Sequence, residues 1–164
     1  MRCEQASWNR AVKTLGVGVS QMWYSNVPPS TSQCDTDLVW NADSGATSHM
    51  TPHHHWLHNY TPDHIPITLA NNTVVYSAGV GSVVFHPKLK GEIVRAVKCT
   101  HVLHVSDLHN NLLSIHYLTH HAGFVVSINS TQMTSVRPPG LTLFVVTITG
   151  NNVAFLDGVT ESVT

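Results

Sequence analysis

Charged side chains are scarce in this chain of 164 residues, at 10% of the composition, and the formal net charge is −1. Nucleic-acid binding needs clustered lysine and arginine to neutralise phosphates. Here the eight basic residues are scattered, and a solvated hairpin edge explains the one local group, between Lys88 and Lys98, equally well. We therefore expect no nucleic acid as a partner of this domain.

Cysteine is also rare: Cys3, Cys34 and Cys99 are odd in number, widely spaced and without a C-x-x-C pair. This pattern argues against a disulfide framework or a zinc knuckle and favours a reducing compartment. No apolar run approaches the roughly 18 residues of a membrane helix, and the N-terminus lacks the apolar core of a secretory signal. We expect a cytoplasmic protein with no membrane partner.

Composition divides the chain into three parts. Residues 1–36 predict a poorly ordered leader that ends in a linker, because positions 26–33 are rich in proline, serine and threonine. Residues 37–128 are expected to form the main domain. Residues 129–164 predict a β-rich extension, in which Asp157 to Thr164 have the character of a frayed end without a role.

Short apolar runs separated by turn residues predict strands over most of the chain, at 38–40, 65–69, 73–76, 82–85, 92–97, 101–105, 124–128, 141–148 and 153–156. Between residues 111 and 121 the apolar residues have helical spacing, and Gly123 is placed to end a helix. Many short strands with one helix predict an all-β fold, a small barrel or folded sheet. The residues with helical spacing are Leu112, Leu113, Ile115 and Leu118.

Asp43-Ser44-Gly45 is the main candidate for chemistry. Taken alone, such a tripeptide is usually a turn, since all three residues favour turns. Its context adds weight, because an apolar strand delivers Asp43 to the loop and Gly45 permits close backbone approach. The following Ala46 and Thr47 are small enough for another chain to lie against them. This combination suits a carboxylate held at the bottom of a cleft by backbone N–H groups.

The segment from Trp40 to Met50 resembles the aspartic protease signature in the Pol polyprotein of copia-type LTR retrotransposons. These proteases belong to the wider retropepsin class. The glycine-rich Gly79-Val80-Gly81, interpreted as a hairpin, is similar to the flap that covers substrate in these enzymes. Residues 101–123 are similar to the segment that leads into their single C-terminal helix. The resemblance covers residues 38–128 and implies a retropepsin-like small β-barrel with one short C-terminal helix.

An aspartic protease needs two carboxylates that share one proton, because two such groups a few ångströms apart do not both ionise. The sequence has no second motif: Asp157-Gly158 lacks the hydroxyl residue, and residues 35–37 lack the glycine. We therefore expect a C2 homodimer in which Asp43 of each chain supplies one carboxylate and the pair activates water. In retropepsins the hydroxyl residue after the aspartate bonds across the dimer axis, a role that the resemblance gives to Ser44.

The resemblance implies an aspartic endopeptidase that cleaves a Gag–Pol polyprotein inside a cytoplasmic virus-like particle, without a cofactor or a metal. Its predicted site comprises the catalytic residues Asp43, Ser44 and Gly45, the loop supports Ala46 and Thr47, and the flap or substrate-binding residues Gly79, Val80 and Gly81.

Two other classes of function remain open. The first is a non-catalytic β-barrel module of the polyprotein, in which the Asp43 loop is structural. The second is a metal-binding module, since His54 and His58, or His55 and His58, would share one face of a helix. No glutamate stands between these histidines and no cysteine lies nearby, which argues against a functional metal site. The cluster comprises His53, His54, His55 and His58 with His49 and His64 flanking it, and His49 is expected to be a packed or capping residue.

Overall fold

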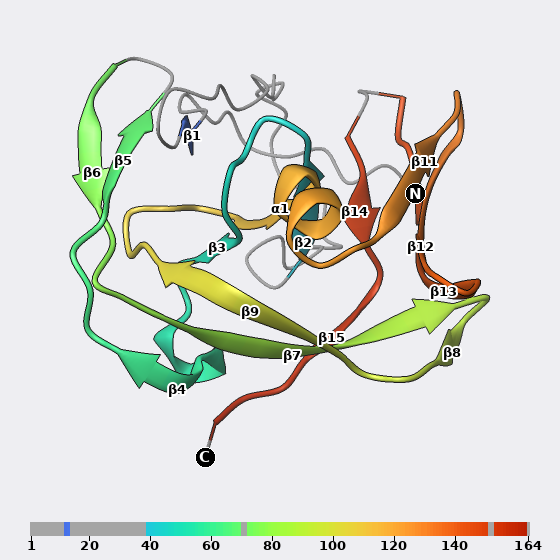
Figure 1. Ribbon diagram of the computed structural model, residues 1–164, viewed down its shortest axis with the longest axis horizontal. Helices are drawn as coiled ribbons and strands as arrows, with labels where there is room; N and C mark the ends of the chain where they lie inside the picture. Colours follow the sequence, from blue (N-terminus) through green and yellow to red (C-terminus); the bar gives the residue numbers. More distant parts are fainter. Residues whose placement is uncertain (1–11, 14–38, 70–71, 151–152, 164) are drawn as a thin grey trace, which may run out of the picture.

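Strands dominate the fold (Figure 1). The computed structural model describes residues 12–13, 39–69, 72–150 and 153–163. Within these residues, fifteen strands accompany one short α-helix, α1, which confirms the predicted all-β class with a single helix. Of the predicted leader, only β1 (Val12–Lys13) is described, so the expectation of poor order for residues 1–36 falls outside the described residues. No helix in the described part of the chain is long and apolar enough to cross a membrane.

The largest sheet contains nine strands in the order β14-β2-β10-β3-β9-β7-β15, with β4 and β8 also pairing with β7. Two of its pairings are parallel, β2 with β10 and β3 with β9. The path of described strands starts at β14 and ends at β15 without closing into a ring. The strands are β2 (Trp40–Asp43), β3 (Met50–Thr51), β4 (His58–Thr61), β7 (Gly79–Leu89), β8 (Glu92–Ile93), β9 (Val97–His104), β10 (Asn111–Ser114), β14 (Phe155–Leu156) and β15 (Gly158–Thr160).

Two smaller sheets flank the largest one (Figure 1). One has the order β1-β5-β6, in which the predicted strands at 65–69 and 73–76 are confirmed as a hairpin. The other has the order β11-β12-β13 and follows α1 in the chain. The remaining elements are β5 (Pro66–Leu69), β6 (Val74–Tyr76), the 3-10 helix η2 (His54–Trp56), α1 (Ile115–His120), β11 (Val125–Ile128), β12 (Gln132–Arg137) and β13 (Leu141–Thr147).

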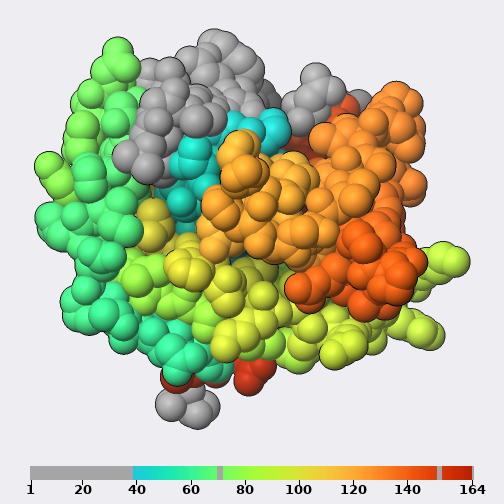
Figure 2. Space-filling view, in the orientation of Figure 1, coloured from blue at the N-terminus to red at the C-terminus, as the bar shows by residue number. Residues whose placement is uncertain are grey.

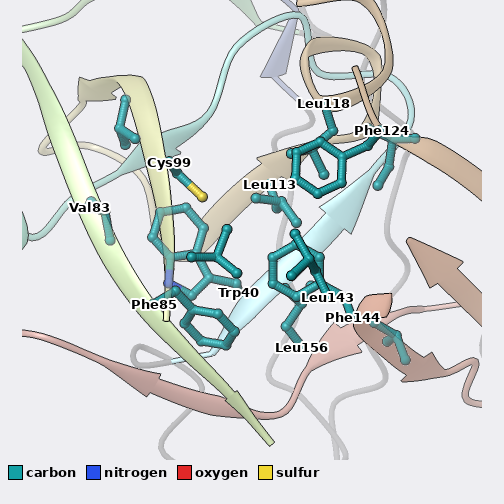
Figure 3. Packing of buried hydrophobic residues seen from close by; sticks show 14 of the residues in the cluster. Trp40, Val83, Phe85, Cys99, Leu113, Leu118, Phe124, Leu143, Phe144 and Leu156 are labelled. Atoms are coloured by element: carbon teal, nitrogen blue, oxygen red, sulfur yellow. The ribbon is translucent and has the colours of Figure 1, made fainter. Parts of the chain in front are cut away.

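The main hydrophobic core contains side chains from the largest sheet, from α1 and from the β11-β12-β13 sheet (Figure 3). Trp40 of β2 lies within it, and its indole N–H donates to the Thr160 hydroxyl of β15 at 2.9 Å. Cys99 lies in the same core, where burial raises the pKa of its thiol to about 12, so it packs as an apolar residue. A second cluster joins Met50 and Leu112 to inward side chains of β5.

The predicted helix between residues 111 and 121 is too long, because Asn111–Ser114 form β10 and α1 begins only at Ile115. β10 pairs with strands on both sides, so all four of its residues are buried and no polar alternation appears in its sequence. Apolar spacing alone does not separate such a strand from a buried helix. Gly123 does lie just beyond the helix, with φ at +70°, and the next N–H donates to the Leu118 carbonyl.

Gly158–Thr160 form β15, so the prediction of a frayed end from Asp157 onward is wrong for these residues. β14 pairs with β2, where the Ala42 N–H donates to the Ala154 carbonyl at 2.8 Å. β15 pairs with β7, and the Lys88 N–H donates to the Asp157 carbonyl at 2.9 Å. β14 and β15 are the first and the last strand in the strand order of the largest sheet. The division of the chain at residue 128 stays a prediction.

Gly158 is the position where a small substitution should weaken the packing of β15 on β7. A Cβ atom there would lie 2.4 Å from both the His86 carbonyl oxygen and the Phe85 ring. Gly158→Ala should therefore lower the free energy of unfolding by about 1–3 kcal/mol, measured by urea denaturation. Gly150→Ala is the matched control, because no atom lies within 4 Å of its added methyl group. Equal stability of the two variants would contradict a close fit of β15 on β7.

Candidate functional site

Asp43 lies at the end of β2, where the strand passes into a tight loop. Its side chain is buried, with 2% of its surface exposed, and one carboxylate oxygen, Oδ1, accepts the Gly45 N–H at 2.6 Å. This contact forms an Asx turn, in which the side-chain oxygen of an aspartate accepts a hydrogen bond from the backbone N–H two residues later. Ser44 at the tip is exposed, Ala46 is buried and Thr47 is half-buried. The predicted loop residues therefore do lie together around one carboxylate.

Asp43 is the one buried carboxylate in the described ranges. The side chains of Asp63, Asp107, Asp157 and Glu161, like that of Glu92, belong to exposed residues. Burial of a carboxylate is costly unless hydrogen bonds compensate it, so such a group usually has a structural or chemical reason. No second buried carboxylate stands near enough in the described part of the chain to form a pair with Asp43.

β10 holds β2 in place beside the loop. The two strands pair in parallel, with Asn111 opposite Trp40 and Ser114 opposite Asp43. The Asn111 side chain is fully buried and donates to the Val39 carbonyl at 3.2 Å. Its carbonyl oxygen also accepts the Thr51 hydroxyl at 2.6 Å, which links β10 to β3. One amide side chain of β10 thereby bonds both β3 and the residue that precedes β2.

Ser114 connects the loop to α1. Its hydroxyl donates to the Ala46 carbonyl at 2.5 Å and accepts the Tyr117 N–H at 2.9 Å, so it also caps the helix. The Ser114 N–H donates to Nδ1 of His49 at 3.0 Å. His49 is 1% exposed, and burial lowers the pKa of its imidazole to about 4, so it is neutral at pH 7. The structure places His49 as a packed residue beside the loop, as the sequence led us to expect.

The α1 side of the site is closed by aromatic packing. The Tyr117 ring stands edge-on to His49, with 4.9 Å between ring centroids, and its hydroxyl lies 2.9 Å from Nδ1 of His101. The space-filling view shows residues of α1 over the middle of one face, with cyan atoms of the β2–β3 segment beside and above them (Figure 2). Asp43 and Ala46 are therefore buried beneath this packing, whereas Ser44 at the tip of the loop stays exposed.

Gly79-Val80-Gly81 lie in β7, which is one continuous strand, so the expected hairpin at these residues is wrong. They pair with β9 on one side, and β4 pairs at Val80 on the other. A Cβ at Gly79 would lie 2.3 Å from the Tyr60 ring, so glycine here admits an aromatic side chain from β4. Three strands, β10, β3 and β9, separate β7 from β2 in the strand order of the sheet. Their substrate-binding role stays a prediction.

The histidine cluster does not form the expected helix face. η2 ends at Trp56, and His58 begins β4, so the i, i+4 pairing is not realised. His54 instead packs against Tyr60, with centroids 4.4 Å apart, and against His104 at 5.3 Å. Burial, and then the neighbouring His54, lowers the pKa of His104. No group of three or more His, Cys, Asp or Glu in the described ranges is placed to hold a metal ion.

Sequence reasoning named the loop but missed the residues that anchor it. Ser114, Asn111 and Tyr117 lie far from Asp43 along the chain, and the parallel pairing of β2 with β10 brings them to it. One signal was available for Ser114, because a serine directly before an apolar helical run is a typical N-cap.

Residues 40–124 match the family described as Pol polyprotein, beta-barrel domain. The match covers just over half of the chain, from the start of β2 to the residue before β11. No curated protein and no solved structure matches the chain. The matched stretch contains the Asp43 loop, β7, β9, β10 and α1, whereas β14 and β15 lie outside it.

Proposed function

The chain belongs to the family of Pol polyprotein beta-barrel domains, and from that premise we propose that it is a retropepsin-like aspartic endopeptidase of a copia-type retrotransposon. Its substrate is an extended segment of a Gag–Pol polyprotein. The active form is a homodimer with one Asp43 per protomer, and it works in the cytoplasm inside a virus-like particle.

The observation that carries the proposal is Asp43 itself. It is the one buried carboxylate in the described ranges, it lies where a core strand ends, and a backbone N–H fixes one of its oxygens. Buried acids in such positions are where proteins set up acid–base chemistry. Asp43 supplies one of the two carboxylates that the reaction needs, and the described ranges contain no other buried one. This supports a requirement for a second chain.

In the dimer, Asp43 and Asp43 of the partner subunit share one proton. The ionised carboxylate removes a proton from a bound water molecule, whose oxygen attacks the scissile carbonyl carbon. The protonated carboxyl gives its proton to the carbonyl oxygen, which yields a tetrahedral diol. The diol then collapses: the carboxyl that took the water's proton gives it to the nitrogen, the other carboxylate takes a proton from a diol hydroxyl, and the C–N bond breaks, so the pair again holds one proton. Ser44, exposed at the loop tip, is available to bond across the axis.

A non-catalytic polyprotein module is the second candidate, and the burial of Asp43 favours it. With 2% of its surface exposed, the side chain does not reach water in the single chain. The same contact with Gly45 would serve a purely structural turn. The two candidates differ in whether pairing of two chains turns the loop into a water-filled cleft.

Substitution of Asp43 by asparagine separates the two candidates. If the proposal is right, Asp43→Asn should lower cleavage of a polyprotein-derived peptide by at least about 10²-fold, because the general base is lost. Cleavage by the unsubstituted chain should also be blocked by pepstatin. Asp63→Asn, at an exposed aspartate, is the matched control and should cleave normally. Cleavage that survives Asp43→Asn would leave the module as the better account.

A further inference from the structure

The loop that carries Asp43 is held at both of its ends by one residue. Ser114 lies opposite Asp43 in the parallel pairing of β10 with β2, where the loop begins. Its hydroxyl donates to the Ala46 carbonyl, where the loop turns away from β2. Both contacts come from a residue that is fully buried. A shift of the loop at Ala46 would break this hydrogen bond, and a shift at Asp43 would disturb the pairing with β10.

Ser114 is in turn held from two directions. Its N–H donates to Nδ1 of His49, and His49 is fixed in the core between the loop and β3. Its hydroxyl accepts the Tyr117 N–H, and the Tyr117 ring packs on His49. The hydroxyl thus uses its donor and accepts one bond, and the imidazole uses its Nδ1 acceptor. Networks of this kind, when each member is bonded, hold one geometry.

We propose that Ser114 and His49 are the positioning residues of the half-site, the half of the active site that one chain supplies. They hold the Asp43–Ala46 loop in the one conformation that can pair with the same loop of a second chain. The inference rests on the proposed function for its kinetic consequence, whereas the ordering of the loop can be measured in a chain that cleaves nothing. Neither residue touches the reacting atoms, so both act through the backbone that carries Asp43.

The structural arm of the test measures amide hydrogen exchange in the full chain. Ser114→Ala removes the bond to Ala46 but keeps the N–H bond to His49. Exchange at Gly45, whose N–H is bonded to Asp43, should become faster by about tenfold, while exchange at Lys88 in the distant half of β7 should not. Unchanged exchange at Gly45, or equal acceleration at Lys88, would overturn the proposal.

Ser77→Ala is the matched control. Ser77 is fully buried, its hydroxyl donates to the Asp63 carbonyl at 2.8 Å, and it accepts the Ile65 N–H at 3.0 Å. It therefore has the same bonding pattern as Ser114 at a place away from the Asp43 loop. Ser77→Ala should cost similar stability and leave exchange at Gly45 unchanged; faster exchange there would mean that any buried serine has this effect, and would overturn the assignment.

A second pair of variants keeps the test valid if Ser114→Ala folds poorly. His49→Asn retains an acceptor near the position of Nδ1, whereas His49→Phe fills the space without one. The asparagine variant should keep slow exchange at Gly45 and the phenylalanine variant should lose it. Equal exchange in the two variants would overturn the role of the Nδ1 acceptor.

The kinetic arm applies where the chain cleaves peptide. A misplaced loop should lower kcat for Ser114→Ala by about tenfold or more and change KM by less than about twofold, because substrate contacts remain. Ser114→Thr, which keeps the hydroxyl, should recover most of the loss. A change in KM with kcat intact would overturn the positioning role. If the unsubstituted chain cleaves nothing, the proposed function fails, and the exchange measurements still decide whether Ser114 orders the loop.

Discussion

Adding Asp43→Asn chains to a fixed amount of unsubstituted chain should lower peptide cleavage to about one tenth when the variant is in ninefold excess. Random pairing then leaves about one unsubstituted chain in ten with an unsubstituted partner. A mixed pair has a single ionisable carboxyl and lacks the shared proton that the reaction needs. The measurement is the initial rate of cleavage of a polyprotein peptide, taken where specific activity no longer depends on protein concentration.

Kinetic constants distinguish inhibition by the formation of mixed pairs from simple competition for substrate. Mixed pairs remove active sites, so kcat per unsubstituted chain falls and KM stays constant. Variant chains that merely bound peptide would raise the apparent KM and leave kcat unchanged. A rate that is independent of added Asp43→Asn would mean that one chain is sufficient. The half-site interpretation would then be wrong, whatever the identity of the nucleophile.

The local features of the site could be predicted from the sequence because they depend on neighbours along the chain. A turn at Asp43-Ser44-Gly45 follows from the conformational preferences of those residues, and the structure has it. The hairpin of β5 and β6 follows in the same way from apolar runs on either side of turn residues. These elements need no knowledge of which strand lies beside which.

The long-range features could not be predicted because pairing between distant segments decides them. Asn111–Ser114 became a strand since β2 and β3 flank it, and the same apolar residues would fit a helix. The glycines of β7 were interpreted as a hairpin, whereas they give room to Tyr60 from β4. Gly158 and Thr160 gained their roles only by meeting β7 and Trp40. A propensity scan assigns no partner to such short segments.

Stability should fall as the solution is acidified from pH 6.5 to pH 4, and His49 should cause about 3 kcal/mol of that fall. The folded chain holds His49 at a pKa of about 4, below the value of 6.5 for an exposed histidine, because burial penalises its charged form. Within this window the unfolded chain binds a proton that the folded chain does not. Unfolding therefore becomes easier as pH falls, and the full stability is present above pH 6.5.

Urea denaturation at several pH values measures this slope, and His49→Asn should flatten it. His104, whose pKa is also lowered, contributes in the same direction, so some slope should remain. Ser77→Ala serves as the control, because it removes a buried polar group that does not titrate and should lower the whole curve without changing its slope. If the free energy of unfolding falls with pH at the same slope in His49→Asn and in the unsubstituted chain, then the imidazole of His49 does not cause the loss of stability in acid.

The same imidazole opposes the chemistry proposed for Asp43. A shared proton on the carboxylate pair is favoured by acid, since both groups ionise as pH rises. Protonation of His49 would turn its Nδ1 from an acceptor into a donor that faces the Ser114 N–H, so the loop would lose its anchor in the same acid range. Cleavage should therefore be best in weakly acidic solution, and His49→Asn should extend its acid limb to lower pH. If the acid limb of the pH–activity profile does not move in His49→Asn, then the carboxylate pair alone causes that limb.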